Sequence, residues 1–136
     1  MADWKIVNAE NLKPFWIGEV YSSKLLTGDE MAGRQVININ EGTLIGGARI
    51  EGAAHEETEI YYIINGTGDV WLDDDCIHVK PGDIIIIPPG VFHWIDNRMN
   101  DQPFVLFTLW HRQEDNGVYH KRLEAWGKSV KTIDEE

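Results

Sequence analysis

The sequence contains a single cysteine among its 136 residues, so Cys76 cannot form an intramolecular disulfide. Basic residues are also scarce: 12 Lys and Arg stand against 23 Asp and Glu, which gives a formal net charge of −11 at pH 7. That charge has the wrong sign for a phosphate backbone or an anionic lipid surface. We therefore expect neither nucleic acid nor a membrane as a partner.

Long apolar runs are absent as well. The longest, at residues 84–89, is far below the roughly 18–20 residues that a helix needs to cross a bilayer. The first ten residues, MADWKIVNAE, show neither the basic segment nor the apolar segment of a signal peptide. Together with the single cysteine, these absences predict a cytoplasmic protein.

Hydrophobic residues, glycine and proline are plentiful. Hydrophobic residues make up 43% of the chain, enough for a packed core, and the length suits a single domain over residues 1–136. The 13 glycines and 5 prolines divide the chain into short segments rich in β-branched and aromatic residues, none of which shows helical periodicity. Strands are predicted at residues 21–26, 35–40, 59–65, 70–72, 77–79, 83–87, 92–97 and 104–110.

Three of these segments, residues 61–64, 84–87 and 104–110, are apolar on both faces of the predicted strand. A strand with one wet face would alternate, so both faces should be covered. This favours an all-β sandwich or small closed barrel, with a second copy of the chain as the simplest cover for its outer face. We therefore expect a homodimer.

The two ends of the chain differ from this pattern. Residues 1–14 are predicted to form an N-terminal arm that docks on a neighbour, with a strand of the chain's own barrel as the alternative. Residues 111–136 are polar and acidic at the end, and predict a C-terminal extension that forms a tail or a short helix over residues 119–126.

Two spaced patterns carry candidate chemistry. Residues 47–66 read G-x5-A-x-H-x3-E-x6-G, and residues 82–97 read G-x5-P-x-G-x2-H-x3-N. In the second pattern a rigid Pro-Gly turn would aim His93 at one point. In the first, a turn at residues 56–58 lets His55 and Glu59 face each other. Two imidazoles and one carboxylate would then meet, which is a metal-ligand set.

The two patterns resemble the two motifs of the cupins, small β-barrels in which G-x5-H-x-H-x3,4-E-x6-G is followed by G-x5-P-x-G-x2-H-x3-N. The resemblance implies a double-stranded β-helix, or jelly-roll, barrel with motif one at residues 47–66 and motif two at residues 82–97. It implies that His55, Glu59 and His93 are metal ligands. One position departs, because the family's first histidine is replaced by Ala53.

The replacement of the first histidine leaves three ligands and an open position unless another side chain moves in. Glu57, in the turn, is the better stand-in, although a solvated role is the simpler prediction for it. Tyr61 lies two residues beyond Glu59 and shares its face. Simple core filling is the simpler prediction for it, but it is also the candidate catalytic residue, as an acid or base or by binding a substrate oxygen. Phe92 and the strand at residues 104–110 are predicted to line a pocket for a small organic substrate.

Three functions remain open for this site. A 2-His-1-carboxylate set with open positions suits Fe(II) and oxygenase or dioxygenase chemistry, which we favour. The same set would hold zinc, manganese or nickel for non-redox lyase or isomerase chemistry. The alternative is a non-catalytic barrel that binds a small ligand as a sensor or regulatory module.

Overall fold

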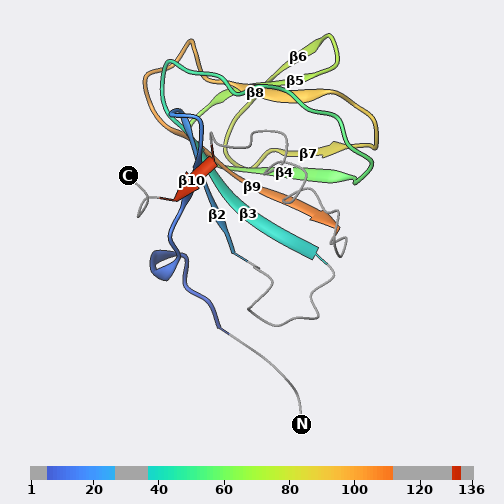
Figure 1. The fold of residues 1–136 in the computed structure, drawn as a ribbon. Helices are drawn as coiled ribbons and strands as arrows, with labels where there is room; N and C mark the ends of the chain where they lie inside the picture. Colours follow the sequence, from blue (N-terminus) through green and yellow to red (C-terminus); the bar gives the residue numbers. More distant parts are fainter. Residues whose placement is uncertain (1–5, 27–36, 112–129, 133–136) are drawn as a thin grey trace.

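The structure is a computed structural model, and it describes residues 6–26, 37–111 and 130–132. Within these residues the regular structure is almost entirely β (Figure 1). One short 3-10 helix, η1 (Ala9–Asn11), comes before ten strands. These are β1 (Phe15–Ile17), β2 (Tyr21–Leu25), β3 (Ile37–Leu44), β4 (Glu59–Asn65), β5 (Gly68–Leu72), β6 (Asp75–Val79), β7 (Ile84–Ile87), β8 (His93–Asp96), β9 (Phe104–His111) and β10 (Val130–Thr132).

The strands form two antiparallel sheets that face each other. The larger has the order β10-β1-β2-β3-β9-β4-β7 and the smaller has the order β6-β5-β8. Figure 1 shows the smaller sheet lying over one end of the larger one. The chain passes from the larger to the smaller sheet after β4 and after β7, so the second motif spans both layers, and the first reaches β8 through isolated bridges at Arg49 and Ala53. The prediction of an all-β, two-sheet cupin-like fold is confirmed.

The space between the sheets holds the core. Alternate residues of each strand point inward, as on β3, where every second side chain is buried. The fully buried aliphatic and aromatic side chains come from both layers: Leu44, Ile63, Val70, Ile87, Ile95, Phe104 and Leu106. Apolar surface from both layers therefore drives the packing of one sheet onto the other.

Two strands were not predicted, and both lie at the same edge of the larger sheet. β1 pairs with β2 and with β10, which lies inside the predicted C-terminal extension. Local sequence does not signal such pairing, because residues more than 110 positions apart meet. The helix predicted over residues 119–126 lies outside the described residues. In the part of the chain that the structure describes, no helix has the length and hydrophobicity to span a membrane.

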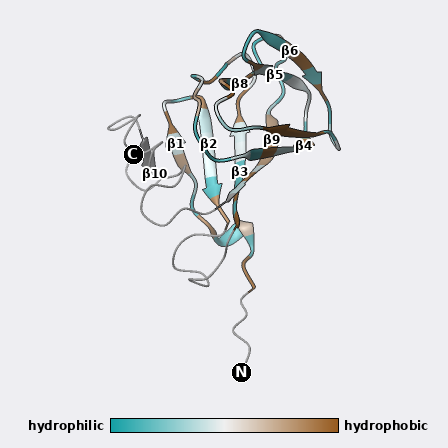
Figure 2. Cartoon of the chain, turned by 90° about the vertical axis from the view of Figure 1, so that its right-hand side faces the viewer, coloured by the Kyte–Doolittle hydropathy of each residue, from teal (hydrophilic) through white to brown (hydrophobic). Residues whose placement is uncertain are grey.

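The described residues leave the outward face of the apolar strands uncovered, so the expectation that a second copy of the chain covers it stays a prediction. On the outward face of the larger sheet, Ile86 is 66% exposed, Ile84 59% and Tyr62 42%. In Figure 2 the deepest brown on this sheet lies around β4 and β9. The inward face alone is covered by the second sheet.

Candidate metal centre

The turn between β7 and β8 positions His93. Gly90 has φ +82°, a left-handed conformation that favours glycine, and it comes directly after two prolines. Its backbone N–H donates to the carbonyl oxygen of His55 at 2.9 Å. The turn of the second motif is therefore bonded directly to the first histidine of the site, and His93 enters β8 at a fixed place.

The three predicted ligands meet at one atom. Nε2 of His55 lies 2.8 Å from Oε2 of Glu59, and Nε2 of His93 lies 3.0 Å from the same oxygen. Candidate ligand atoms of the three residues all lie within 4.8 Å of one another. Glu59 is 0% exposed, so this carboxylate is held inside the protein beside two imidazoles. The prediction that His55, Glu59 and His93 come together is confirmed.

Backbone carbonyls orient both imidazole rings. Nδ1 of His55 lies 2.9 Å from the carbonyl oxygen of Glu57, and Nδ1 of His93 lies 2.8 Å from that of Val91. A carbonyl oxygen only accepts, so Nδ1 carries the proton in each ring and the neutral imidazole presents its Nε2 lone pair. This is the orientation in which histidine binds a metal.

The resulting arrangement calls for a cation. With Nδ1 protonated, two Nε2 lone pairs and a carboxylate oxygen point at one another, and three acceptors repel unless a proton or a metal ion lies between them. A divalent ion satisfies all three groups at once, and it removes the cost of burying the carboxylate of Glu59. The donor set therefore fits a metal.

The departure from the family motif lies at the edge of this site. Ala53 and His93 exchange two backbone hydrogen bonds of 3.1 and 3.0 Å, so they are directly opposite each other. Such pairs place their Cβ atoms about 5 Å apart. The side of the site next to Ala53 therefore carries only a methyl group, and in the described residues the candidate ligand set has three members.

Glu57 is the clearest error of the sequence prediction. It is buried instead of solvated, and it does not join the ligand group. Its carboxylate lies 3.6 Å from Nδ1 of His55, on the side of the ring that faces away from Glu59. Glu57 therefore orients His55 through its carbonyl group and supplies no stand-in ligand.

Tyr61 points into the barrel, as its parity with Glu59 predicts. Its side chain is buried, and its ring centroid lies 6.0 Å from that of His93, with the rings inclined at 72°. Tyr62 faces away. Phe92 is 45% exposed, and its ring packs against Gly52, so closely that an added Cβ there would come within 2.4 Å of it. The parity of β8 explains this exposure, because Phe92 points opposite to His93.

The last residue of the second motif has a structural role. Asn97 is fully buried, and its amide group donates to the carbonyl oxygens of Ile45 at 3.2 Å and Gln102 at 2.7 Å. The backbone carbonyl oxygen of Asn97 accepts a hydrogen bond from the backbone N–H of Gly47 at 3.0 Å. Asn97 thus connects the ends of both motifs, while their centres carry the ligands.

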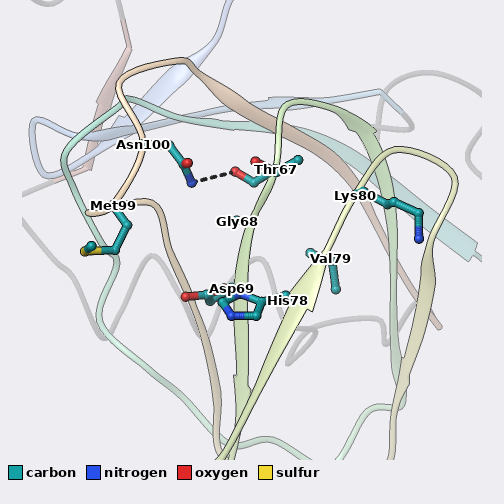
Figure 3. A pocket seen from close by; sticks show the side chains of 8 residues that line it. All are labelled: Thr67, Gly68, Asp69, His78, Val79, Lys80, Met99 and Asn100. Carbon is teal, nitrogen blue, oxygen red and sulfur yellow. Dashed lines mark hydrogen bonds and ion pairs between the residues drawn. The ribbon is translucent and has the colours of Figure 1, made fainter.

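A separate hollow of about 580 Å³ lies at the other end of the smaller sheet (Figure 3). Gly68, one of its lining residues, is at the opposite end of β5 from Leu72, which pairs with His93. Inside it the imidazole of His78 bonds to the carboxylate of Asp69, and Asn100 donates to the carbonyl oxygen of Thr67. This hollow does not belong to the candidate metal centre.

Comparisons with curated proteins cover part of the chain. An uncharacterized protein of Methanocaldococcus jannaschii is 51% identical over 39 residues, which are 29% of this chain and 31% of the relative. Acireductone dioxygenase 1 of Coprinopsis cinerea is 38% identical over 48 residues, 29% of this chain and 25% of the relative. These matches span less than a third of either relative.

Comparisons of structure and of family cover more of it. A predicted oxalate decarboxylase from Thermotoga maritima has a TM-score of 0.71 and 20% identity, over 80% of this chain and 100% of that one, which shows a shared fold. A family model of the cupin domain matches residues 40–111, more than half of the 136 residues. Both motifs and all three candidate ligands lie inside this match. The chain therefore belongs to the cupin family.

Proposed function

We propose that the protein is a metal-dependent enzyme that acts on a small organic substrate, with His55, Glu59 and His93 as the metal ligands. One observation carries this proposal: two imidazoles with fixed Nδ1 protons converge on a single oxygen of a buried carboxylate. A purely structural cluster would need a proton between these acceptors to relieve their repulsion. A metal ion removes the repulsion and leaves open coordination positions for a substrate.

Fe(II) is the metal that this donor set favours. Two histidines and one carboxylate with open positions suit non-haem iron, which supplies oxygen chemistry when it is bound. One relative is by name a dioxygenase, which supports this branch. Ala53 supports it as well, because the methyl group opposite His93 keeps a coordination position open.

Non-redox chemistry is the second candidate. Zinc, manganese or nickel in the same set supplies a Lewis acid, and a lyase or isomerase needs no more than that and a group that moves a proton. The fold is similar to that of a predicted decarboxylase, which supports this branch. A barrel that only binds a small ligand is the remaining alternative.

Tyr61 is the group that we propose moves the proton. Its phenol stands on the inward face of β4, two residues beyond Glu59, and its ring lies edge-on to that of His93. Tyr61→Phe keeps the ring and removes the hydroxyl. We expect it to retain the metal and to lower kcat by about 10²-fold or more, the usual range for general acid-base catalysis.

The test separates the three branches by metal and by oxygen. Protein purified without affinity tag or chelator is analysed for metal, and a second sample is reconstituted anaerobically with Fe(II), Zn(II), Mn(II) or Ni(II). Both are assayed with small hydroxy-ketones, dicarbonyls and carboxylic acids, with and without oxygen. Oxygen uptake with iron supports the oxygenase, and turnover without oxygen supports the lyase or isomerase. A protein that binds no metal under any condition contradicts the proposal and leaves the ligand-binding module.

We also propose that a second copy of the chain covers the outward face of the larger sheet. Register places Tyr62 beside Ile84 on one side and Phe107 on the other, and Ile60 beside Ile86 and Leu109. None of these six side chains is charged, so two copies with a net charge of −11 each would meet where like charges are absent. β7 is the edge of this sheet, and an exposed apolar edge strand favours pairing with another chain.

A further inference from the structure

A row of buried polar side chains crosses the interior of the larger sheet beside the metal centre. Asn40 on β3, Thr108 on β9 and Trp110 on β9 are each at most 3% exposed. Thr108 is the only polar side chain in the otherwise apolar stretch of residues 104–110. Polar groups in such a place cost free energy unless something bonds to them.

Strand register connects this row to the candidate catalytic residues. Thr108 pairs with Asn40 on one side and with Tyr61 on the other, and Trp110 pairs with Glu59. Directly paired residues of neighbouring antiparallel strands have Cβ atoms about 5 Å apart on the same face. The row therefore continues the inward surface that carries Glu59 and Tyr61.

Each member of the row keeps one polar atom without a hydrogen bond. The amide group of Asn40 donates to the hydroxyl of Ser23, but its Oδ1 has no partner. Oγ1 of Thr108 and Nε1 of Trp110 also have none. Asn97, which is equally buried, uses both ends of its side-chain amide: the NH2 group donates to backbone carbonyl oxygens, and Oδ1 accepts from the side-chain amide of Asn100. The buried amide of Asn97 is thus satisfied, whereas three polar atoms on directly paired or alternate positions of β3 and β9 are left unpaired on the face that carries Glu59 and Tyr61.

We propose that Asn40, Thr108 and Trp110 form a subsite that binds the uncharged, hydroxylated carbonyl part of the substrate. The three atoms offer one acceptor, one hydroxyl that both donates and accepts, and one donor. A hydroxy-ketone or hydroxy-aldehyde offers the complement: a carbonyl oxygen for the indole N–H, and a hydroxyl for the threonine and the amide oxygen. No member of the row is charged, so a carboxylate or phosphate gains no ion pair from these three residues.

This inference rests on the proposed function in one respect: the bound molecule is a substrate only if the protein is an enzyme. The unpaired atoms themselves are present whether or not a metal binds. Its first test therefore uses the protein without substrate. Thr108→Val keeps the shape of the side chain and removes the unpaired hydroxyl, so we expect Tm to rise by about 3 °C. Thr43→Val, at an outward position of β3, is the matched control and should leave Tm within about 1 °C.

The second test measures binding of hydroxyacetone, with acetone as the same molecule without its hydroxyl, by calorimetric titration of metal-loaded protein. We expect wild type to bind hydroxyacetone more tightly than acetone, and Thr108→Val to lose at least about five-fold of that preference. Trp110→Phe should weaken the binding of both probes, because both carry the carbonyl group. Metal content is measured in every sample and should not change in Thr108→Val.

The outcomes separate this inference from the proposed function. A lower Tm in Thr108→Val, or equal affinity of wild type for the two probes, would overturn the subsite even if the metal is bound. If wild type bound no metal, the proposed function would be overturned. The Tm of Thr108→Val relative to wild type would still show whether the unpaired hydroxyl of Thr108 costs stability, as the subsite requires.

Discussion

On strand β4 a charged side chain is buried and apolar side chains are exposed, which is the reverse of the usual pattern. On its inward face Glu59, a carboxylate, is completely buried, whereas on its outward face Tyr62 and Ile64 are 42% and 38% exposed. Both faces are otherwise apolar in sequence, and hydropathy alone predicts the same environment for each. The difference teaches that each inversion needs its own explanation: the proposed metal ion would account for the buried charge, and the proposed second copy would account for the exposed apolar side chains.

The inward face should give the largest effect. Glu59→Gln keeps the shape of the side chain but removes its charge, so the two imidazoles lose the anion that completes the ligand set. We expect metal affinity to fall by more than the roughly 10–100-fold that loss of a group supporting a ligand costs. Competition with a chromogenic chelator measures it.

Glu56→Gln is the matched control for that experiment, because Glu56 is a neighbouring exposed glutamate outside the ligand group. Unchanged affinity in both variants would remove Glu59 from the metal site and with it the contrast between the two faces.

The outward face should give the next largest effect. Ile86→Lys places a charge on the exposed apolar surface, and burial of an unpaired charge opposes association of two copies. We expect the dimer to weaken by roughly 100-fold, with metal content unchanged. Sedimentation velocity over a concentration series measures this. Thr43→Lys, also outward but away from β7, should leave the dimer intact; a wild type that stays monomeric throughout would contradict the proposed second copy.

A substitution at the edge of the candidate metal centre should strengthen metal binding instead of weakening it. Ala53 faces His93 across paired backbone hydrogen bonds, so Ala53→His would bring a third imidazole to the site. We expect metal affinity to rise about tenfold. If oxygen chemistry needs the open position, turnover should fall at the same time. Unchanged metal affinity would mean that position 53 does not reach the metal.

Asp96 is a buried carboxylate whose charge is balanced by a neighbouring arginine instead of a metal ion. Its replacement should have the smallest effect of the changes described. Asp96 accepts hydrogen bonds from the backbone and guanidinium groups of Arg98, which hold the pKa of its carboxyl below the ordinary value of 3.8. Since the folded-state pKa is lowered, the pair contributes stability above about pH 4, and this contribution is lost as the pH falls through the folded pKa.

Asp96→Asn should therefore lower Tm at pH 6, and the difference from wild type should shrink as the pH falls to 3. Thermal melts over this range measure it. Asp74→Asn, in the exposed turn between β5 and β6, serves as the control and should show no such dependence. A Tm difference for Asp96→Asn that stays constant with pH would mean that ionisation of Asp96 does not contribute.

The meeting of two histidines and one glutamate could be predicted from sequence because each residue lies in a motif of fixed spacing. His55, Glu59 and His93 stand at fixed distances from glycines and prolines that shape their turns, and the resemblance of this spacing to the cupin motifs identified them as candidate ligands. The alternation of side chains along a strand correctly predicted that Tyr61 points inward and that Tyr62 points outward.

The features that the sequence did not predict depend on pairing between segments that are far apart in the chain. β10 reaches β1 across most of the chain, and Thr108 meets Asn40 only because β3 and β9 are neighbours. The burial of Glu57 was missed because a glutamate in a turn is ordinarily solvated, and the bond of its backbone carbonyl to His55 leaves no signature in the sequence. A single threonine in an apolar strand was the one signal of the polar row, and its meaning required the register.

The most direct test of the account is the metal content of wild type beside Glu59→Gln and His93→Ala, measured by inductively coupled plasma mass spectrometry after anaerobic reconstitution with Fe(II). The account predicts about one ion per chain in wild type and nearly none in either variant. Wild type without metal, or full metal content in both variants, would contradict the central claim that His55, Glu59 and His93 form the metal centre.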